Sequence, residues 1–254
     1  MRFLLRVLVL AAFMVPAVAA AQVGCLVGDA SEGPIAIIQV NDACVDLSGR
    51  IQEAGKFFIL DTSLTVGDLA TIDLDVTFDP DPSITLGTTT TNLVAGPVTY
   101  AFLFGTPIVP GNYNFASSSG GVTVTTIEGA ATVDNSAVYP TYISAYGTVG
   151  VVPTNLGVDL GTGPCTADGL PVLPDTETCN QGTVSNTFPP TFFNNLEALL
   201  TYTQDGLLSV ASWSGAVILE DRDQEVPEPA TMALLAVSSL ALGVVGMARR
   251  RRQG

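Results

Sequence analysis

Hydrophobic and polar residues alternate along much of this chain with the two-residue period of a β-strand. Between residues 71 and 78, every second position is isoleucine, leucine, valine or phenylalanine, and the positions between them are threonine or aspartate. This alternation predicts a strand with one buried face and one solvated face. The segment Asp79-Pro80-Asp81-Pro82 should end it, because proline lacks the backbone N–H that a sheet requires.

The same pattern recurs along the sequence, and glycine, proline, asparagine or serine interrupts it at short intervals. It predicts further strands at 83–91, 98–104, 122–126, 138–152, 196–203 and 207–219. The last two flank Gln204-Asp205-Gly206, and Asp-Gly between two such runs predicts a hairpin with a type I′ turn. The region from Gly161 to Pro190 reads instead as a long surface loop that carries two cysteines.

Many short strands joined by turn residues, with no long helical periodicity, favour an all-β fold. We therefore predict an antiparallel β-sandwich over residues 22–225, flanked by an N-terminal signal helix and a single C-terminal transmembrane helix. Residues 1–21 read as a signal peptide, since Arg2 and Arg6 precede a short apolar run and the small residues 17–21.

Residues 230–248 form an uncharged, largely apolar segment that is long enough to cross a hydrocarbon core of about 30 Å. Four basic residues follow it directly: Arg249, Arg250, Arg251 and Arg252. Basic residues beside a membrane span remain in the cytoplasm, so the body that precedes the span should lie outside. Both ends of the sequence independently predict this topology.

Just before the span stand Val226, Pro227, Glu228 and Pro229, where the two prolines enforce extended backbone. Residues 226–252, taken together, resemble the PEP-CTERM sorting signal. The resemblance implies processing by an exosortase, a membrane enzyme that cuts near Pro-Glu-Pro. It further implies an inner-membrane-anchored protein with its body in the periplasm, which reaches the cell surface or biofilm matrix after processing and associates with exopolysaccharide.

Charge is divided unevenly along the chain. Only three of the nine basic residues lie between the terminal segments, whereas all 24 acidic residues lie there or at Glu228. So acidic a body should be soluble and should repel nucleic acid.

Histidine is absent from the sequence, which excludes Ser-His-Asp and Cys-His nucleophile systems and any zinc site that needs imidazole.

Four cysteines in an exported chain indicate disulfides. They are Cys25, Cys44, Cys165 and Cys179. Three pairings are possible, and we favour the local ones, Cys25–Cys44 and Cys165–Cys179, each of which should stabilise by roughly 3 kcal/mol.

Calcium is the cofactor hypothesis that the sequence offers, against the alternative that the chain has no cofactor. Asp73, Asp75, Asp79 and Asp81 are close in sequence, and the first two share one face of the predicted strand. A solvated face followed by a proline turn explains the same residues.

These features favour an exported, non-enzymatic surface or matrix protein with a structural or interaction role. A calcium- or carbohydrate-binding adhesion module is the alternative. A surface glycoside hydrolase is a third reading, because paired carboxylates can always be found among 24 acidic residues.

Overall fold

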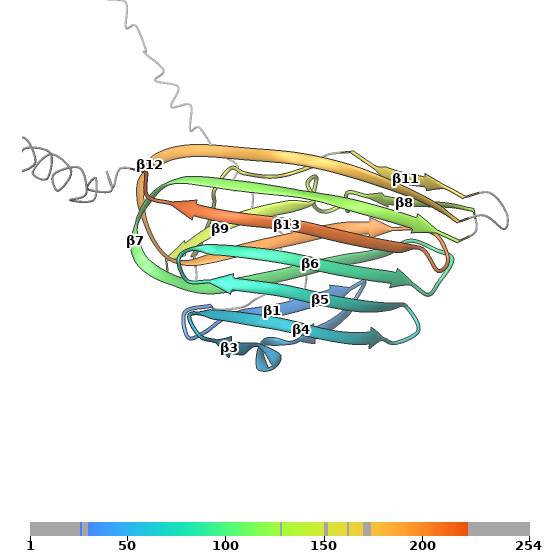
Figure 1. Cartoon of the computed structure of the whole chain (residues 1–254), viewed down its shortest axis with the longest axis horizontal. Helices are drawn as coiled ribbons and strands as arrows, with labels where there is room; N and C mark the ends of the chain where they lie inside the picture. Colours follow the sequence, from blue (N-terminus) through green and yellow to red (C-terminus); the bar gives the residue numbers. More distant parts are fainter. Residues whose placement is uncertain are drawn as a thin grey trace, which may run out of the picture.

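A computed structural model describes residues 26, 30–127, 129–149, 152–161, 163–169 and 174–222. These residues form a molecule built almost wholly of antiparallel β-strands (Figure 1). The strands are β1 (Ile35–Val40), β2 (Ala43–Asp46), β3 (Gln52–Ala54), β4 (Phe57–Val66), β5 (Ala70–Asp79), β6 (Ser83–Asn92), β7 (Val98–Thr126), β8 (Ala130–Asp134), β9 (Ile143–Val149), β10 (Val152–Asn155), β11 (Cys165–Asp168), β12 (Asp175–Gln204) and β13 (Val210–Glu220). Within the described residues, one 3-10 turn, η1, spans Ser48–Arg50.

The strands belong to one 13-stranded sheet that folds over into two layers. The first layer runs β3-β4-β5-β6-β13, followed by the second half of β7 and the first half of β12. The second layer contains β2 and β1, the first half of β7, the second half of β12, and then β9 and β10. The predicted antiparallel, sandwich-like architecture is therefore confirmed.

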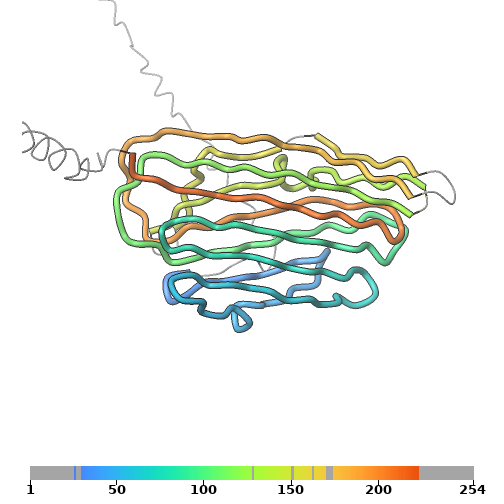
Figure 2. The backbone as a smooth tube through the Cα atoms, viewed as in Figure 1, coloured from blue at the N-terminus to red at the C-terminus, as the bar shows by residue number. Residues whose placement is uncertain are grey.

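Two very long strands connect the layers. β7 has 29 residues and β12 has 30, and both turn at the same end of the molecule (Figure 2). The pairing of β12 with β7 shifts register between Thr187 and Thr191, and again between Phe193 and Asn195. Such irregularities bend a strand. Pro189 and Pro190 occupy the first of them, where their missing N–H groups interrupt no ladder.

The core lies between the layers and is filled by the inward-facing side chains of both. At its centre is an aromatic stack made of Tyr100, Phe102, Tyr142, Tyr202 and Trp213, all at most 3% exposed. Ring centroids are 5.1 Å apart for Tyr100 and Tyr202, 5.4 Å for Tyr202 and Trp213, and 4.8 Å for Tyr142 and Trp213. Burial raises the pKa of the three tyrosine hydroxyls above the usual 10.0.

A buried polar network crosses the core beside this stack. Thr90 of β6 lies in the first layer, and Tyr202 and Gln204 of β12 lie in the second. The Thr90 Oγ1 atom is 2.9 Å from the Tyr202 hydroxyl, and it donates a hydrogen bond to Gln204 Oε1 at 2.6 Å. Gln204 Nε2 donates in turn to the Ser209 carbonyl at 2.8 Å. Because each of these bonds is shielded from water, the network fixes how the two layers face each other.

The strand prediction for residues 71–78 is confirmed by β5, in which Ile72, Leu74, Val76 and Phe78 are all buried. The predicted strands at 98–104 and 122–126 are the two ends of one strand, β7.

The predicted hairpin at Asp205-Gly206 is wrong. β12 and β13 do not pair with each other, because the chain crosses there from the second layer to the first. Among described non-glycine residues, positive φ occurs only at Asn41 and Leu208, so Asp205 does not adopt the type I′ geometry.

The predicted surface loop from Gly161 to Pro190 is also largely wrong. It contains β11 and the first half of β12, which pairs with β7 from Asp175↔Thr126 to Thr187↔Phe115. The predicted Cys165–Cys179 disulfide is confirmed and joins β11 to β12. Cys44 is also disulfide-bonded; its predicted partner Cys25 lies outside the described residues.

The predicted signal peptide and C-terminal segment lie outside the described residues as well. Within the part of the chain that the structure describes, no helix is long and apolar enough to cross a membrane.

Candidate functional site

The sorting residues predicted from the sequence, Val226 to Pro229 and Arg249 to Arg252, all lie beyond Arg222, where the described body ends. Arg222 is held at the bend end of the molecule. Its backbone N–H donates to Asn114 Oδ1 at 2.9 Å, and its guanidinium lies over the Phe115 ring, 3.1 Å from the ring centroid.

The four candidate calcium ligands are not gathered into a metal site. Asp73 and Asp75 are exposed on the outer face of β5, as the two-residue period predicts. Asp79 lies at the end of that strand, where its Oδ1 accepts the Asp81 backbone N–H at 3.0 Å and so stabilises the turn. In the described residues, no three histidine, cysteine, aspartate or glutamate side chains are placed to hold a metal ion. The exposed face and its turn are what the alternative reading expects, and calcium binding by these residues stays a prediction.

The outer face of the first layer is a broad surface of small polar side chains. Hydroxyl groups meet across neighbouring strands, with Oγ atoms 3.1 Å apart for Thr123 and Thr178 and 3.0 Å apart for Thr89 and Ser212. These pairs belong to one cross-strand row, because Ser212 is registered with both Thr89 and Thr123. The face thus presents hydroxyl groups to solvent in an ordered array.

The outer face of the second layer is partly covered. The row formed by Ile37, Leu103 and Leu199 is buried in a small apolar cluster together with Leu26 and Ala30. One row further along β7, Ala101 lies between Gln39 of β1 and Thr201 of β12. Because alanine is much smaller than its neighbours, the sheet surface dips at this position.

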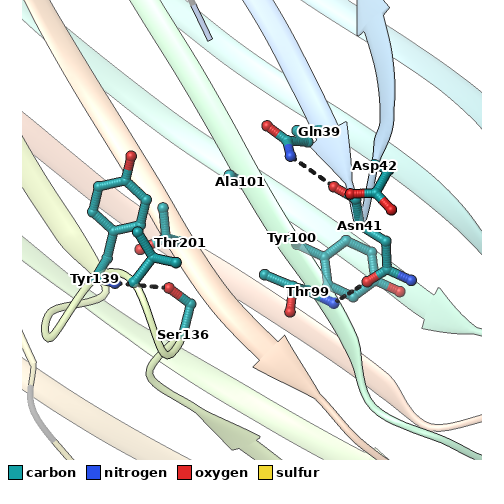
Figure 3. A pocket seen from close by; sticks show the side chains of 10 residues that line it. Gln39, Asn41, Asp42, Thr99, Tyr100, Ala101, Ser136, Tyr139 and Thr201 are labelled. Atoms are coloured by element: carbon teal, nitrogen blue, oxygen red, sulfur yellow. Dashed lines mark hydrogen bonds between the residues drawn. The ribbon is translucent and has the colours of Figure 1, made fainter. Parts of the chain in front are cut away.

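This dip is the floor of a hollow of about 430 Å³ (Figure 3). One wall is the turn between β1 and β2, with Asn41 and Asp42. The facing wall is the segment between β8 and β9, with Ser136, Val138 and Tyr139. The hollow thus has sheet for its floor and a chain connection on either side.

Both walls are fixed by hydrogen bonds. Asn41 has φ of +50°, a left-handed conformation that asparagine tolerates better than most residues. Its Oδ1 accepts the Thr99 N–H at 2.9 Å, and its own N–H donates to the Thr99 carbonyl at 2.8 Å. Opposite, Ser136 Oγ accepts the Tyr139 N–H at 3.0 Å, and Asn135 Nδ2 donates to the Pro140 carbonyl at 2.8 Å. The hollow is therefore preorganised.

Polar groups of several kinds line it. Gln39 Nε2 donates to the Asn41 carbonyl at 2.7 Å, which places its amide along one wall. Asp42 is exposed and is the only carboxylate among the lining residues. Tyr139 is half-buried, so part of its ring contacts the protein and part faces outward. An aromatic surface opposite planar polar groups suits a ligand that has an apolar face and a polar rim.

The sequence did not reveal the hollow. Its lining residues come from four separate segments that only the pairing of β1, β7 and β12 brings together. Ala101 carries no chemical signal by itself, and its importance comes from the larger neighbours on either side. The left-handed Asn41, in an Asn-Asp turn between apolar runs, was the one local signal available.

Comparisons with known proteins assign no family. No protein-family model matches the sequence, and no curated protein matches it. Among solved structures, the chain is similar to the enzymatically active domain of bacteriophage CBA120 tailspike protein 4, with 10% identity and a TM-score of 0.25. That similarity covers 65% of this chain but only 19% of the length of the other.

A second similar structure is TmCBM61 in complex with β-1,4-galactotriose, with 4% identity, 52% of this chain and 71% of that chain covered, and a TM-score of 0.24. At TM-scores this low, neither likeness carries an argument about the function of this chain.

Proposed function

We propose that this chain is an exported surface or matrix protein, anchored through its C-terminal segment and then released by an exosortase. The support comes first from charge. An uncharged segment at 230–248 that closes on four arginines is expected to stop in the membrane, since moving that much positive charge through a bilayer is costly. The body before it then lies in the periplasm, on the side to which the N-terminal segment directs it.

Processing is the second part of the proposal. Pro227, Glu228 and Pro229 stand between the last described residue, Arg222, and the proposed span. From Arg222 to residue 230 the chain can reach at most about 28 Å, because an extended residue spans at most about 3.5 Å. The folded body is thus kept close to the bilayer, and cleavage at the Pro-Glu-Pro segment would free it to the cell surface or matrix.

The role proposed for the body is structural or interactive, without catalysis. The observation that carries this is the ordered array of hydroxyl groups on the first layer, exemplified by the Thr89–Ser212 and Thr123–Thr178 pairs. A broad polar face built from short side chains on a rigid sheet can hydrogen-bond a hydrated polymer over many points. Exopolysaccharide is the partner that suits such a face.

Mass spectrometry of protein recovered from the envelope and medium of producing cells tests the proposal. The native chain should show an oxidised Cys165–Cys179 pair and a C-terminus close to Pro229. Replacing Pro227, Glu228 and Pro229 by alanine should leave protein that still ends beyond Arg252 and stays in the membrane fraction.

The matched control is Glu225→Ala, which lies just outside the motif and should be processed normally. Native protein that retains Arg252 in every fraction would refute processing but leave anchoring intact. Reduced cysteines in a cytosolic body would refute export itself.

A further inference from the structure

We propose that the hollow on the second layer binds a neutral sugar unit of an extracellular polysaccharide, with Tyr139 against the sugar ring and the β1–β2 turn against its hydroxyl groups. This inference rests on the proposed function, since it names a second site, and the class of sugar, through which the body would hold its matrix. It concerns the layer opposite the hydroxyl array.

The shape of the hollow fits a single sugar or a short run of sugars. Its volume of about 430 Å³ lies within the range of roughly 300–1,000 Å³ found for small-molecule sites. The hollow is not enclosed, so a sugar within a longer chain can enter without a free end. Ala101 decides the depth, because a larger side chain there would fill the dip between Gln39 and Thr201.

The chemistry of the two walls matches the two kinds of surface on a sugar. A pyranose ring has C–H groups on its faces and hydroxyl groups around its rim. The ring of Tyr139 offers an apolar plane to the first. Opposite it, the Asp42 carboxylate can accept hydrogen bonds from the hydroxyl groups of the sugar.

The positions of these groups are set before any ligand arrives. Asn41 is held by two bonds to Thr99, and the Tyr139 backbone is held by the Ser136 hydroxyl. A ligand therefore orders little of the protein when it binds, which favours affinity from a modest number of contacts.

Electrostatics select among sugars. Asp42 is the only carboxylate in the hollow, no arginine or lysine lines it, and the body as a whole is strongly acidic. A uronic acid or sulfated sugar would place its charge beside a carboxylate with no cation to compensate, which is unfavourable. The site should therefore prefer neutral hexoses to acidic sugars.

Calorimetric titration of the full chain, purified in a zwitterionic detergent without a sugar headgroup, tests the inference. The probes are neutral oligosaccharides of glucose, galactose and mannose, together with a polyuronate oligosaccharide. The native chain should bind at least one neutral probe saturably and the polyuronate more weakly. Tyr139→Ala should weaken that binding about tenfold, as expected for loss of one aromatic contact.

Three further variants sharpen the result. Tyr139→Phe keeps the ring and should bind nearly as the native chain does. Ala101→Leu fills the floor and should abolish binding, while its melting temperature shows whether the fold persists. Phe192→Ala removes an aromatic side chain that is 46% exposed outside the hollow, so it is the matched control and should bind normally.

The inference is overturned if no neutral probe binds, if the polyuronate binds more tightly, or if both Tyr139→Ala and Ala101→Leu bind like the native chain. These outcomes are distinct from failure of the proposed function. A chain that is exported and processed but binds no sugar loses only this inference. A chain that binds sugar but remains unprocessed keeps it.

Discussion

Removal of the Cys165–Cys179 disulfide is the most direct test of how the body is held together. This bond ties β11 to the first half of β12. Among the described residues, β11 is four residues long and pairs only with β8, which is itself short. Within the same part of the chain, the first half of β12 pairs only with β7 and forms an edge of the first layer. The disulfide therefore fastens the short β11 to the edge of the first layer.

The expected cost follows from the length of chain that the bond closes. The two cysteines are 14 residues apart. In the chain-entropy account, a loop of this size constrains the unfolded chain by about 3 kcal/mol at 25 °C. For a domain of this size, each kcal/mol corresponds to roughly 2–4 °C in Tm, so the double variant should melt about 6–12 °C lower.

The assay is thermal unfolding followed by circular dichroism, comparing the native chain with Cys165→Ala/Cys179→Ala under oxidising conditions. Alanine is preferred to serine because Cys165 is fully buried, and burying a hydroxyl group is more costly than burying a methyl group. Chemical reduction is a poorer test, since it would also break the disulfide of Cys44. A Tm that falls by less than about 2 °C would refute the reasoning and mean that the unfolded chain gains little freedom from the cut.

Three other predictions concern the core. Tyr202→Phe should destabilise the fold by about 1–2 kcal/mol, because the Tyr202 hydroxyl forms a hydrogen bond across the layers. Tyr100→Phe should be neutral or stabilising, since the buried Tyr100 hydroxyl has no partner among the described residues. Denaturant unfolding measures the stability of both variants. Because burial raises the pKa of the stack tyrosines, stability should be complete below pH 10.0 and fall as pH rises above it, with phenolate absorbance appearing together with unfolding. Gly147→Ala should cost about 1–3 kcal/mol, since its Cβ would lie 2.7 Å from the Phe193 ring, whereas at Gly96 the same change meets no atom within 4 Å and should be nearly silent.

The sequence predicted best the strands in which local alternation and burial coincide. β5 is such a strand, because Ile72 and Leu74 face the core while Asp73 and Asp75 face water. Its end was equally clear, since Asp79-Pro80 cannot continue a ladder. In β5, the local pattern alone therefore predicts the strand, its buried face and its end.

Prediction failed where tertiary pairing overrides local composition. Residues 175–190 contain asparagine, glycine, threonine and two prolines, and they read as loop. They form a strand because β7 offers a complete ladder beside them, from Thr126 to Phe115. The hairpin predicted at Asp205-Gly206 also failed, although there the local composition suited the predicted element. Its local chemistry suits a hairpin, but Thr203 and Gln204 already pair with β7 and β8.

The candidate site was beyond the sequence because it depends on register. Gln39, Ala101 and Thr201 are far apart in sequence, and a shift of one residue in either pairing would turn a different set outward. The same holds for the hydroxyl array. Threonine at alternate positions shows that a face is polar, but only the alignment of β6, β13 and β7 shows that the hydroxyl groups meet.

The residues that hid the first half of β12 from prediction also explain how it can exist as an edge strand. An exposed edge presents unpaired N–H and C=O groups and invites pairing with another chain. This edge carries Asp175 and Glu177, a glycine of positive φ at 182, and two prolines. Charge repels a second copy, while glycine and proline break the regular spacing that a partner strand needs. The opposite edge of the first layer, β3, is only three residues long and so offers little to pair with. The proposed matrix role would require the protein to avoid edge-to-edge aggregation at high local concentration. The charged residues, the glycine and the prolines of this strand protect its free edge from a second chain, while the other edge still pairs with β7.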